Sequence, residues 1–330
     1  MVFSRRNALK LDHLYNLIGP DMQAVDAVIR TRLHSEVILV RQVAEYIINA
    51  GGKRLRPALV LLSAGAFGYS GSRHHELAAI IEFIHTATLL HDDVVDESDL
   101  RRGRETANAL FGNAASVLVG DFLYSRSFQM MVEVGDMRIM RVLSDATNII
   151  AEGEVLQLMN CHDADVDEER YLQVIRYKTA KLFEAASQLG AIIGGAGPEM
   201  ERSLAEYGMH LGTAFQLIDD VLDYSGAEAE TGKHLGDDLA EGKPTLPLIH
   251  VMQNGTSDQA ECVRKAIEHG GREDFPAVLA AIRATGALEH TQKQARAEAE
   301  RAAGALESLP ASTYKDSLLE LSAFAVARSF

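Results

Sequence analysis

The stretch from Ala58 to Gly197 contains no proline, although the chain of 330 residues has 7 prolines elsewhere. Because proline kinks or ends a helix, its absence permits long helices throughout this stretch. Sustained alternation of apolar and polar residues, typical of strands, is hard to find there. Apolar residues instead recur every three or four positions, as do Leu77, Ile80, Ile84, Ala87, Leu90 and Val94. The pattern predicts an all-α protein built from long helices.

Clusters of Gly and Asn separate the expected helices, and none of them resembles a linker between domains. From residue 254 to residue 330 the composition shifts towards Ala, Glu, Gln and Arg, with few bulky apolar residues. Such a composition is typical of helices that face solvent. We therefore expect a single domain over residues 1–330, in which residues 254–330 form a more solvated helical part.

The chain is acidic, with 47 Asp and Glu against 32 Lys and Arg and a formal net charge of −15. This charge argues against a nucleic-acid-binding protein and against a polybasic protein of membrane surfaces. Its only cysteines, Cys161 and Cys262, are far apart, so neither a disulfide framework nor a thiolate zinc site is expected. A reducing, cytoplasmic location is the prediction.

No segment resembles a secretory signal or a transmembrane helix. Lys10, Asp12 and His13 interrupt the apolar residues near the N-terminus. The most apolar run, Ala58 to Phe67, is shorter than the ~18 to 20 residues that span a bilayer. The sequence thus predicts a soluble protein.

An acidic cluster at the end of an apolar run is the strongest chemical signal. Asp92, Asp93 and Asp96 follow the apolar run, and on a helix Asp92 and Asp96 point the same way from adjacent turns. Two such carboxylates repel each other and favour a bound cation, and their hard oxygen atoms favour Mg²⁺ or Mn²⁺ over zinc. For this cluster alone, a solvated helix end remains the alternative.

A second cluster has the same spacing and makes coincidence a poor explanation. Asp219, Asp220 and Asp223 again follow an apolar helical run. Mg²⁺ usually takes one or two protein carboxylates together with substrate phosphate. Two acidic clusters therefore predict a diphosphate ligand bridged to the protein by several metal ions.

Basic and polar residues that suit phosphate oxygens lie near these clusters in the sequence. Each has an alternative: the Gly-Gly-Lys-Arg segment could be an ordinary basic loop, Lys178 a surface lysine and His85 a core histidine. The Gly-x-x-x-x-Gly-Lys motif of a P-loop is absent. The candidates are Lys53, Arg56, His85, Arg101, Arg102, Lys178, Thr179 and Lys233.

Taken together, these motifs resemble the trans-isoprenyl diphosphate synthase family, most closely its long-chain members, the octaprenyl diphosphate synthases. The resemblance extends over nearly the whole chain, and no position that the family uses for chemistry departs from the pattern. Its landmarks here are Gly51–Pro57, His91–Gly103, Asn113–Asp121, Gly153–Gln157, Lys178–Ala180, Gly212–Asp220 and Gly236–Pro247.

The resemblance also implies a role for each candidate residue. The direct Mg²⁺ ligands would be Asp92, Asp96 and Asp219, supported by Asp93, Asp220 and Asp223. Residues that would hold the allylic diphosphate are Arg101, Lys178, Thr179, Gln216 and Lys233. Those that would hold isopentenyl diphosphate are Lys53, Arg56, His85 and Arg102. The catalytic set would be Asp92, Asp93, Asp96, Lys178, Asp219 and Asp220.

The fold and reaction implied by the resemblance are those of a prenyltransferase. It implies a single-domain bundle around a deep central cavity, usually in a homodimer, with three Mg²⁺ ions that Mn²⁺ could replace. Isopentenyl diphosphate would add head to tail to an allylic diphosphate such as farnesyl diphosphate, through an allylic cation, with loss of pyrophosphate. The released pyrophosphate would accept the final proton, and the octaprenyl product would supply a quinone side chain. Its release is expected to involve transient membrane contact.

Product length depends on how deep the cavity is. Ala87 and Thr88 precede Asp92 by about one helical turn and are both small, whereas short-chain members of the family generally carry an aromatic residue there. Each further turn of depth is about 5.4 Å, comparable to one isoprene unit. We expect the floor at Phe128 or Met131.

Three other readings are weighed against this one. Terpene cyclases and head-to-head synthases do not need a second diphosphate site, and cyclases usually line their cavities with aromatic residues, which are 6% of this chain. Non-catalytic partner subunits typically lose aspartates that this chain keeps. A purely structural helical scaffold would explain neither acidic cluster.

Overall fold

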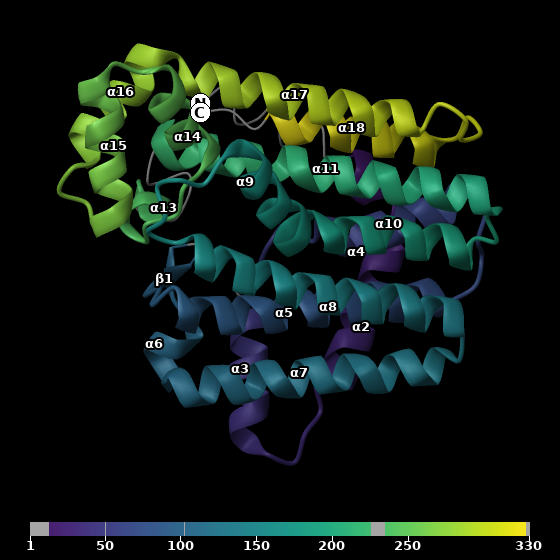
Figure 1. Ribbon diagram of the computed structural model, residues 1–330. Coiled ribbons are helices and arrows are strands. Elements are labelled where there is room, and N and C mark those ends of the chain that lie inside the picture. Colours follow the sequence, from purple (N-terminus) through teal and green to yellow (C-terminus); the bar gives the residue numbers. More distant parts are fainter. Residues whose placement is uncertain (1–12, 50, 102, 226–234, 328–330) are drawn as a thin grey trace. The chain divides into compact units, whose positions relative to one another are not determined.

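The structure is a computed structural model that describes residues 13–49, 51–101, 103–225 and 235–327. Arg102 and Lys233, two predicted substrate-binding residues, lie outside the described residues. Figure 1 shows the elements in chain order. Their bounds are α2 Gly19–Arg32, α3 Ile38–Asn49, α4 Leu55–Gly65, α5 Arg73–Val95, β1 Leu100–Arg101, β2 Arg104–Glu105, α6 Ala107–Phe111, α7 Asn113–Val134, α8 Met137–Asn160, α9 Glu168–Ile175, η1 Arg176–Ala180, α10 Lys181–Ile193, α11 Pro198–Ser225, α13 Asp237–Ala240, α14 Leu246–Asn254, α15 Ser257–His269, α16 Phe275–Thr285, α17 Ala287–Ala305 and α18 Thr313–Ala327.

The all-α prediction is confirmed. In the part of the chain that the structure describes, the strands are limited to β1 and β2, which form a short antiparallel pair with Leu100 opposite Glu105. The proline-free stretch contains the long helices α5, α7 and α8, as expected from its composition. None of the described helices combines the length and the apolar character needed to cross a membrane.

The chain divides into two compact units, and each is described by itself. Unit 1 comprises Met1–Thr147, Leu182–Gly208 and Ala305–Leu321, and unit 2 comprises Asn148–Lys181, Met209–Gly304 and Ser322–Phe330. The chain passes from one unit to the other within the helices α8, α10, α11, α17 and α18. The first acidic cluster belongs to unit 1 and the second to unit 2.

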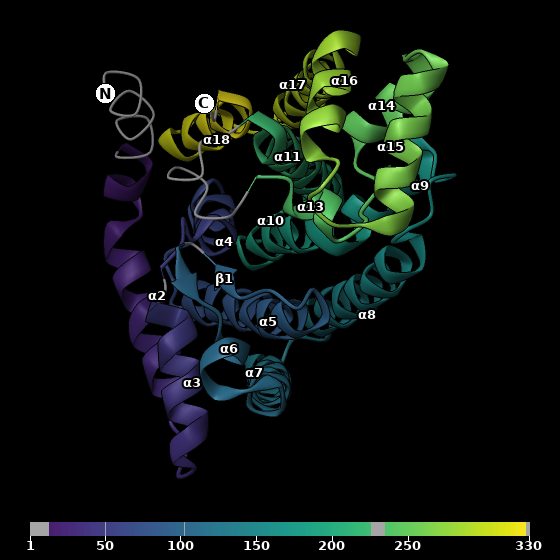
Figure 2. The same cartoon turned by 90° about the vertical axis from the view of Figure 1, so that its left-hand side faces the viewer.

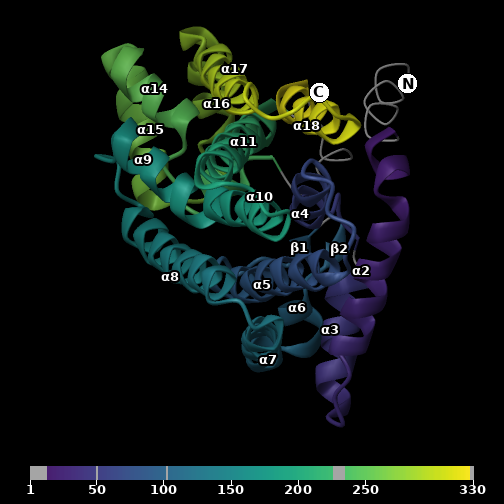
Figure 3. The same ribbon diagram turned by 90° about the vertical axis from the view of Figure 1, so that its right-hand side faces the viewer.

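Helix α5 is the centre of unit 1. It packs against α2, α4 and α7, and Figures 2 and 3 show it between α4 and α7. Leu77, Ile80, Ile84 and Leu90, which carry the apolar pattern in the sequence, have no exposed surface. A helix surrounded by three others buries more than one face, and its apolar residues accordingly extend around it.

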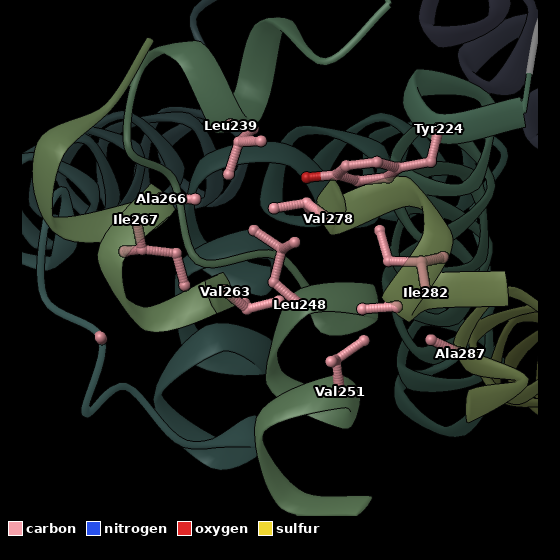
Figure 4. Packing of buried hydrophobic residues seen from close by; sticks show 12 residues of the cluster. Tyr224, Leu239, Leu248, Val251, Val263, Ala266, Ile267, Val278, Ile282 and Ala287 are labelled. Atoms are coloured by element: carbon pink, nitrogen blue, oxygen red, sulfur yellow. The ribbon is translucent and has the colours of Figure 1, made fainter. Parts of the chain in front are cut away.

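Unit 2 has its own hydrophobic core, formed largely by α14, α15 and α16. Figure 4 shows Leu248, Val251, Val263 and Ile282 converging with Tyr224 from the end of α11. All five side chains are almost completely buried. This core holds the end of α11, and therefore the second acidic cluster, in a fixed position within the unit. The prediction of a more solvated part over residues 254–330 stays a prediction.

Candidate active site

Half-exposed polar side chains form a stripe along helix α5 and the residue that caps its C-terminal end. His85, Thr88, Asp92 and Asp96 keep partial exposure at spacings of three and four residues. The backbone N–H of Asp96 donates to the carbonyl of Asp92 at 2.8 Å, so the two aspartates are one helical turn apart. The predicted register of the first cluster is confirmed, and its two outer carboxylates lie on the accessible face of the helix.

The middle aspartate of this cluster points into the protein instead. Asp93 has no exposed surface, and Nε of Arg101 donates to its Oδ1 at 2.7 Å. Its backbone carbonyl accepts from the backbone N–H of Ser98 at 3.0 Å and from Nδ2 of Asn108 at 3.2 Å. Asp93 therefore organises the segment that follows the helix, and Arg101, which we predicted to hold a diphosphate, is also its ion-pair partner.

The second cluster, in unit 2, repeats this division between outer and middle aspartates. On α11, Asp219 and Asp223 are half-exposed, as is Gln216 one turn earlier, whereas Asp220 is 2% exposed. Two clusters of identical spacing thus each present two accessible carboxylates and bury the one between them. Solvated helix ends, the alternative reading, do not require a buried carboxylate.

Asp220 is held by two hydrogen bonds from residues of its own unit. The hydroxyl of Tyr171 on α9 donates to Oδ2 at 2.5 Å, and Nε2 of Gln216 donates to Oδ1 at 2.9 Å. Burial raises the pKa of Asp220 well above its ordinary value, and the negative charge of Asp238 adds to the rise. The two hydrogen bonds oppose this effect because they stabilise the ionised carboxylate.

Asp223, the last residue of the second cluster, connects α11 to α13. Its two carboxylate oxygens accept the backbone N–H groups of Asp237 at 3.2 Å and Asp238 at 3.3 Å. These N–H groups begin α13 and have no partner within that helix, so the carboxylate stabilises its start. Asp223 therefore has a structural role in addition to the supporting role predicted for it.

A short π-helix carries two of the predicted diphosphate residues of unit 2. Nζ of Lys178 in η1 lies 2.6 Å from Oε2 of Glu154 on α8, and the hydroxyl of Thr179 donates to Oε1 of Gln216 at 3.1 Å. Lys178 is thus an ion-paired residue, not a free surface lysine. Single π-helical turns occur often at functional sites.

Gly153 explains how α8 approaches this turn so closely. A Cβ atom at that position would lie 2.6 Å from the backbone nitrogen of Lys178 and 2.8 Å from Cβ of Tyr177. Any larger residue would push η1 away from α8. The Gly-Glu pair at 153–154 therefore sets both the position of η1 and the partner of its lysine.

In unit 1, two residues predicted for the isopentenyl diphosphate site are in contact. Nη1 of Arg56 donates to Nε2 of His85 at 3.2 Å, and the guanidinium lies 4.4 Å from the ring centre of Phe183. His85 occupies the predicted helical face, and this nitrogen accepts a hydrogen bond because arginine can only donate. The pair places one cation beside the half-exposed stripe of α5.

The Gly-Gly-Lys-Arg segment has a backbone that ordinary residues adopt only with strain. Gly51 and Gly52 have φ values of 77° and 148°, and Arg54, at the start of α4, has a φ of 47°. Arg54 is held by Glu82 at 3.3 Å, and Lys53 is exposed. The segment therefore has a specific conformation that presents Lys53 to solvent, unlike a generic basic loop.

The four predicted chain-length residues differ in burial. Ala87 and Met131 have no exposed surface, whereas Thr88 and Phe128 are half-buried. The hydroxyl of Thr88 donates to the carbonyl of His85 at 2.9 Å, and the Phe128 ring lies 5.3 Å from that of Tyr124. Their role in setting product length stays a prediction.

The donor set of the two clusters fits a hard divalent cation. Asp92, Asp96 and Asp219 offer accessible carboxylate oxygens, which are hard ligands that suit Mg²⁺. Elsewhere in unit 1, ligand atoms of Asp21, His74 and His75 lie within 4.8 Å of one another. These residues lie in the first turns of α2 and α5, where the helix dipole disfavours a cation. We interpret that group as a contact that fastens α2 to α5.

Two residues of the candidate site were not identified from the sequence. Tyr171 is hydrogen-bonded to Asp220, and Glu154 is ion-paired with Lys178. The two residues of each pair are far apart in the sequence, so no helical period relates them. Glu154 lies within a motif that was recognised, next to Gly153, and could have been proposed as a partner for a nearby cation. Nothing in the local sequence distinguishes Tyr171 from an ordinary core tyrosine.

The chain is similar to known proteins over nearly its whole length. A profile described as Polyprenyl synthetase matches residues 37–283, which include residues of both units. The chain is 54% identical over 321 residues to octaprenyl diphosphate synthase of Escherichia coli (strain K12), with 97% of this chain and 99% of that protein covered. It is 50% identical over 327 residues to octaprenyl diphosphate synthase of Haemophilus influenzae, with 99% of each covered.

A solved structure is similar over nearly the whole chain. It is a polyprenyl synthase from Caulobacter crescentus CB15 complexed with calcium and isoprenyl diphosphate. Its TM-score is 0.93 at 45% sequence identity, with 96% of this chain and 98% of that chain covered. The similarity therefore extends from sequence to the arrangement of the backbone.

Proposed function

Because this chain belongs to the polyprenyl synthetase family and is a prenyltransferase, we propose that it makes a long-chain all-trans polyprenyl diphosphate, octaprenyl diphosphate. The reaction is the head-to-tail addition of isopentenyl diphosphate to an allylic diphosphate such as farnesyl diphosphate. The observation that carries this proposal is the pair of acidic clusters, each with two accessible carboxylates around a buried one. The names of the relatives at 54% and 50% identity support the octaprenyl product.

The residues of unit 2 would hold the allylic substrate. Lys178 carries a positive charge on the π-helical turn, and Thr179 on the same turn is hydrogen-bonded to Gln216, whose amide supplies N–H donors. Charges and donors fixed before the substrate arrives stabilise the departing pyrophosphate without reorganising during the reaction. Arg101 and Lys233 complete this proposed set.

The residues of unit 1 would hold isopentenyl diphosphate. Lys53, Arg56 and His85 supply a cationic group for its diphosphate, and Arg102 belongs to the same proposed set. Arginine and lysine bind phosphate oxygens well, and a substrate held in register has its double bond placed for attack. The pyrophosphate that leaves is the proposed acceptor of the final proton.

Magnesium is the proposed cofactor, with Asp92, Asp96 and Asp219 as its direct ligands and three ions bound together with the diphosphate. When bound, Mg²⁺ supplies positive charge that stabilises the leaving pyrophosphate. Mn²⁺ would substitute because it accepts the same oxygen ligands. The remaining aspartates, Asp93, Asp220 and Asp223, would act by holding the segments around these ligands.

The proposal also covers the cavity, the oligomeric state and the cellular location of the enzyme. A single domain around a deep cavity would exclude water from the reacting carbon atoms. A homodimer is supported by Val117, Leu118 and Val132, large apolar side chains exposed on α7. The enzyme would be cytoplasmic, would touch membranes only to release product and would supply a quinone side chain.

One incubation tests the proposed function. Purified protein is given Mg²⁺, labelled isopentenyl diphosphate and farnesyl diphosphate, and the dephosphorylated products are sized by chromatography. We expect octaprenol as the main product and no product after chelation of the metal. Absence of any elongation under these conditions would overturn the proposal, and a different main length would overturn its octaprenyl part. Sedimentation of the same sample tests the homodimer.

A further inference from the structure

A chain of hydrogen bonds in unit 2 connects a buried tyrosine to the turn that carries Lys178. Tyr171 donates to Asp220 at 2.5 Å, Gln216 donates to the other oxygen of Asp220 at 2.9 Å, and Thr179 donates to Gln216 at 3.1 Å. Tyr171 is 5% exposed and Asp220 2% exposed, so the interior end of this chain is shielded from water. Its outer end consists of half-exposed residues.

The donors and acceptors in this chain determine how each side chain is turned. The amide nitrogen of Gln216 faces Asp220, to which it donates, and its oxygen faces Thr179, from which it accepts. The Tyr171 hydroxyl occupies the second oxygen of Asp220 and prevents the carboxylate from rotating towards other donors. Because Asp220 is held in place, the Gln216 amide is held in place as well. One of its two N–H groups donates to Asp220, and the other points away from that carboxylate.

We propose that Tyr171 is a positioning residue for the allylic diphosphate, which it orients through Asp220 and Gln216 without touching the substrate. This inference rests on the proposed function, because it assigns the allylic diphosphate to the Thr179 and Gln216 end of the chain. Loss of the hydroxyl leaves Asp220 with one anchor, so the Gln216 amide samples orientations that no longer suit the diphosphate. Isopentenyl diphosphate, proposed to bind residues of unit 1, is affected much less.

A purely structural role for Tyr171 predicts different behaviour. A tyrosine that only fills space and satisfies a buried acceptor changes stability when its hydroxyl is removed, and it changes the kinetics of both substrates alike or not at all. Tyr207 provides the matched control. It lies on α11, has no exposed surface, and its hydroxyl donates to the backbone carbonyl of Leu318 at 2.7 Å, in unit 1.

The experiment compares wild type, Tyr171→Phe and Tyr207→Phe as full-length proteins, with steady-state kinetics for each substrate and a thermal melt for each protein. We expect Tyr171→Phe to raise KM for farnesyl diphosphate about 10-fold, because the lost hydrogen bond acts on the substrate only indirectly, through Asp220 and Gln216. KM for isopentenyl diphosphate should stay within about twofold of wild type. Tyr207→Phe should lower the melting temperature without changing either KM.

A double-mutant cycle tests the route through Asp220. Tyr171 and Gln216 donate to different oxygens of Asp220, whereas an amide offers an acceptor oxygen on one side only, so Asp220→Asn should already break one link of the chain. Adding Tyr171→Phe to Asp220→Asn should then raise KM for farnesyl diphosphate no further. Additive effects would overturn the route that we infer.

The outcomes separate this inference from the proposed function. An active wild type together with unchanged substrate constants in Tyr171→Phe, or with equal changes for both substrates, would overturn the positioning role alone. A wild type that elongates no allylic diphosphate would overturn the proposed function, and this inference with it. A selective rise for the allylic substrate supports both.

Discussion

Arg101 donates from its Nε to Oδ1 of Asp93 at 2.7 Å, and this carboxylate has no exposed surface. Asp92, its neighbour in the chain, lies on the half-exposed face of the same helix. Two adjacent aspartates thus meet different environments because successive helical residues point about 100° apart. One is suited to a metal ion and the other to holding the protein together, which leads to opposite predictions for their variants.

Asp92→Asn should abolish most activity while leaving the fold intact. Loss of one ligand charge at the site where negative charge develops on the leaving group should lower kcat by about 10² to 10⁴-fold. The free energy of unfolding should change little, because Asp92 is half-exposed. Elongation assays and urea unfolding check this prediction. Asp99→Asn, an exposed acidic residue in the following segment, is the control and should retain wild-type activity.

Asp93→Asn should act mainly on stability. Removing the charge partner of Arg101, whose side chain is 19% exposed, should lower the free energy of unfolding by about 2 to 4 kcal/mol. The comparison is Asp165→Asn, which breaks a pair with Arg264 whose side chains are 78% and 40% exposed and should cost less than about 1 kcal/mol. Equal losses in urea unfolding of the two variants would contradict the interpretation of Asp93 as a buried anchor.

Gly153→Ala should displace the π-helical turn η1, against which α8 packs at this position. The added methyl group would lie 2.6 Å from the backbone nitrogen of Lys178, and overpacking of this kind costs about 1 to 3 kcal/mol. We expect a lower free energy of unfolding and a raised KM for the allylic diphosphate. Gly304→Ala on α17, where a Cβ atom meets nothing within 4 Å, should be neutral or slightly stabilising. Equal unfolding free energies and equal KM values in the two variants would show that the close approach of α8 to η1 at Gly153 affects neither quantity.

Phe128→Ala should lengthen the products if this half-buried ring limits the cavity. Removing the ring leaves room for further isoprene units, so the product distribution should shift towards longer chains. Chromatography of the dephosphorylated products measures the shift. Phe122→Ala, on the same helix with its ring 5.0 Å from the Arg126 guanidinium, serves as the control. An unchanged distribution in Phe128→Ala would leave Met131 as the remaining candidate of the two.

His74 should make the protein less stable as the pH falls below about 6.5. Burial lowers the pKa of His74, the nearby His75 lowers it further, and Asp21 partly offsets this. Between the lowered folded pKa and about 6.5 the unfolded chain binds more protons than the folded one, so stability rises with pH in that window. Below the folded pKa of His74, the stability that the neutral imidazole contributes at higher pH is lost.

Unfolding measurements at about pH 7.5 and about pH 5.5 check this dependence. His74→Gln should shrink the difference in unfolding free energy between the two pH values, because the titrating group is gone. His34→Gln removes a histidine whose side chain is 70% exposed and should leave the difference unchanged. A wild-type protein whose stability is the same at both pH values would contradict the assignment.

The sequence by itself determined the all-α class, the register of both acidic clusters and the helical face shared by His85 and Asp92. These features repeat with the period of one helix, so neighbours in space are also neighbours in the chain. The contacts of Asp93 with Arg101, of Lys178 with Glu154 and of Asp220 with Tyr171 were decided only by the tertiary structure. Each joins different elements, and no local period encodes which side chains meet when helices pack.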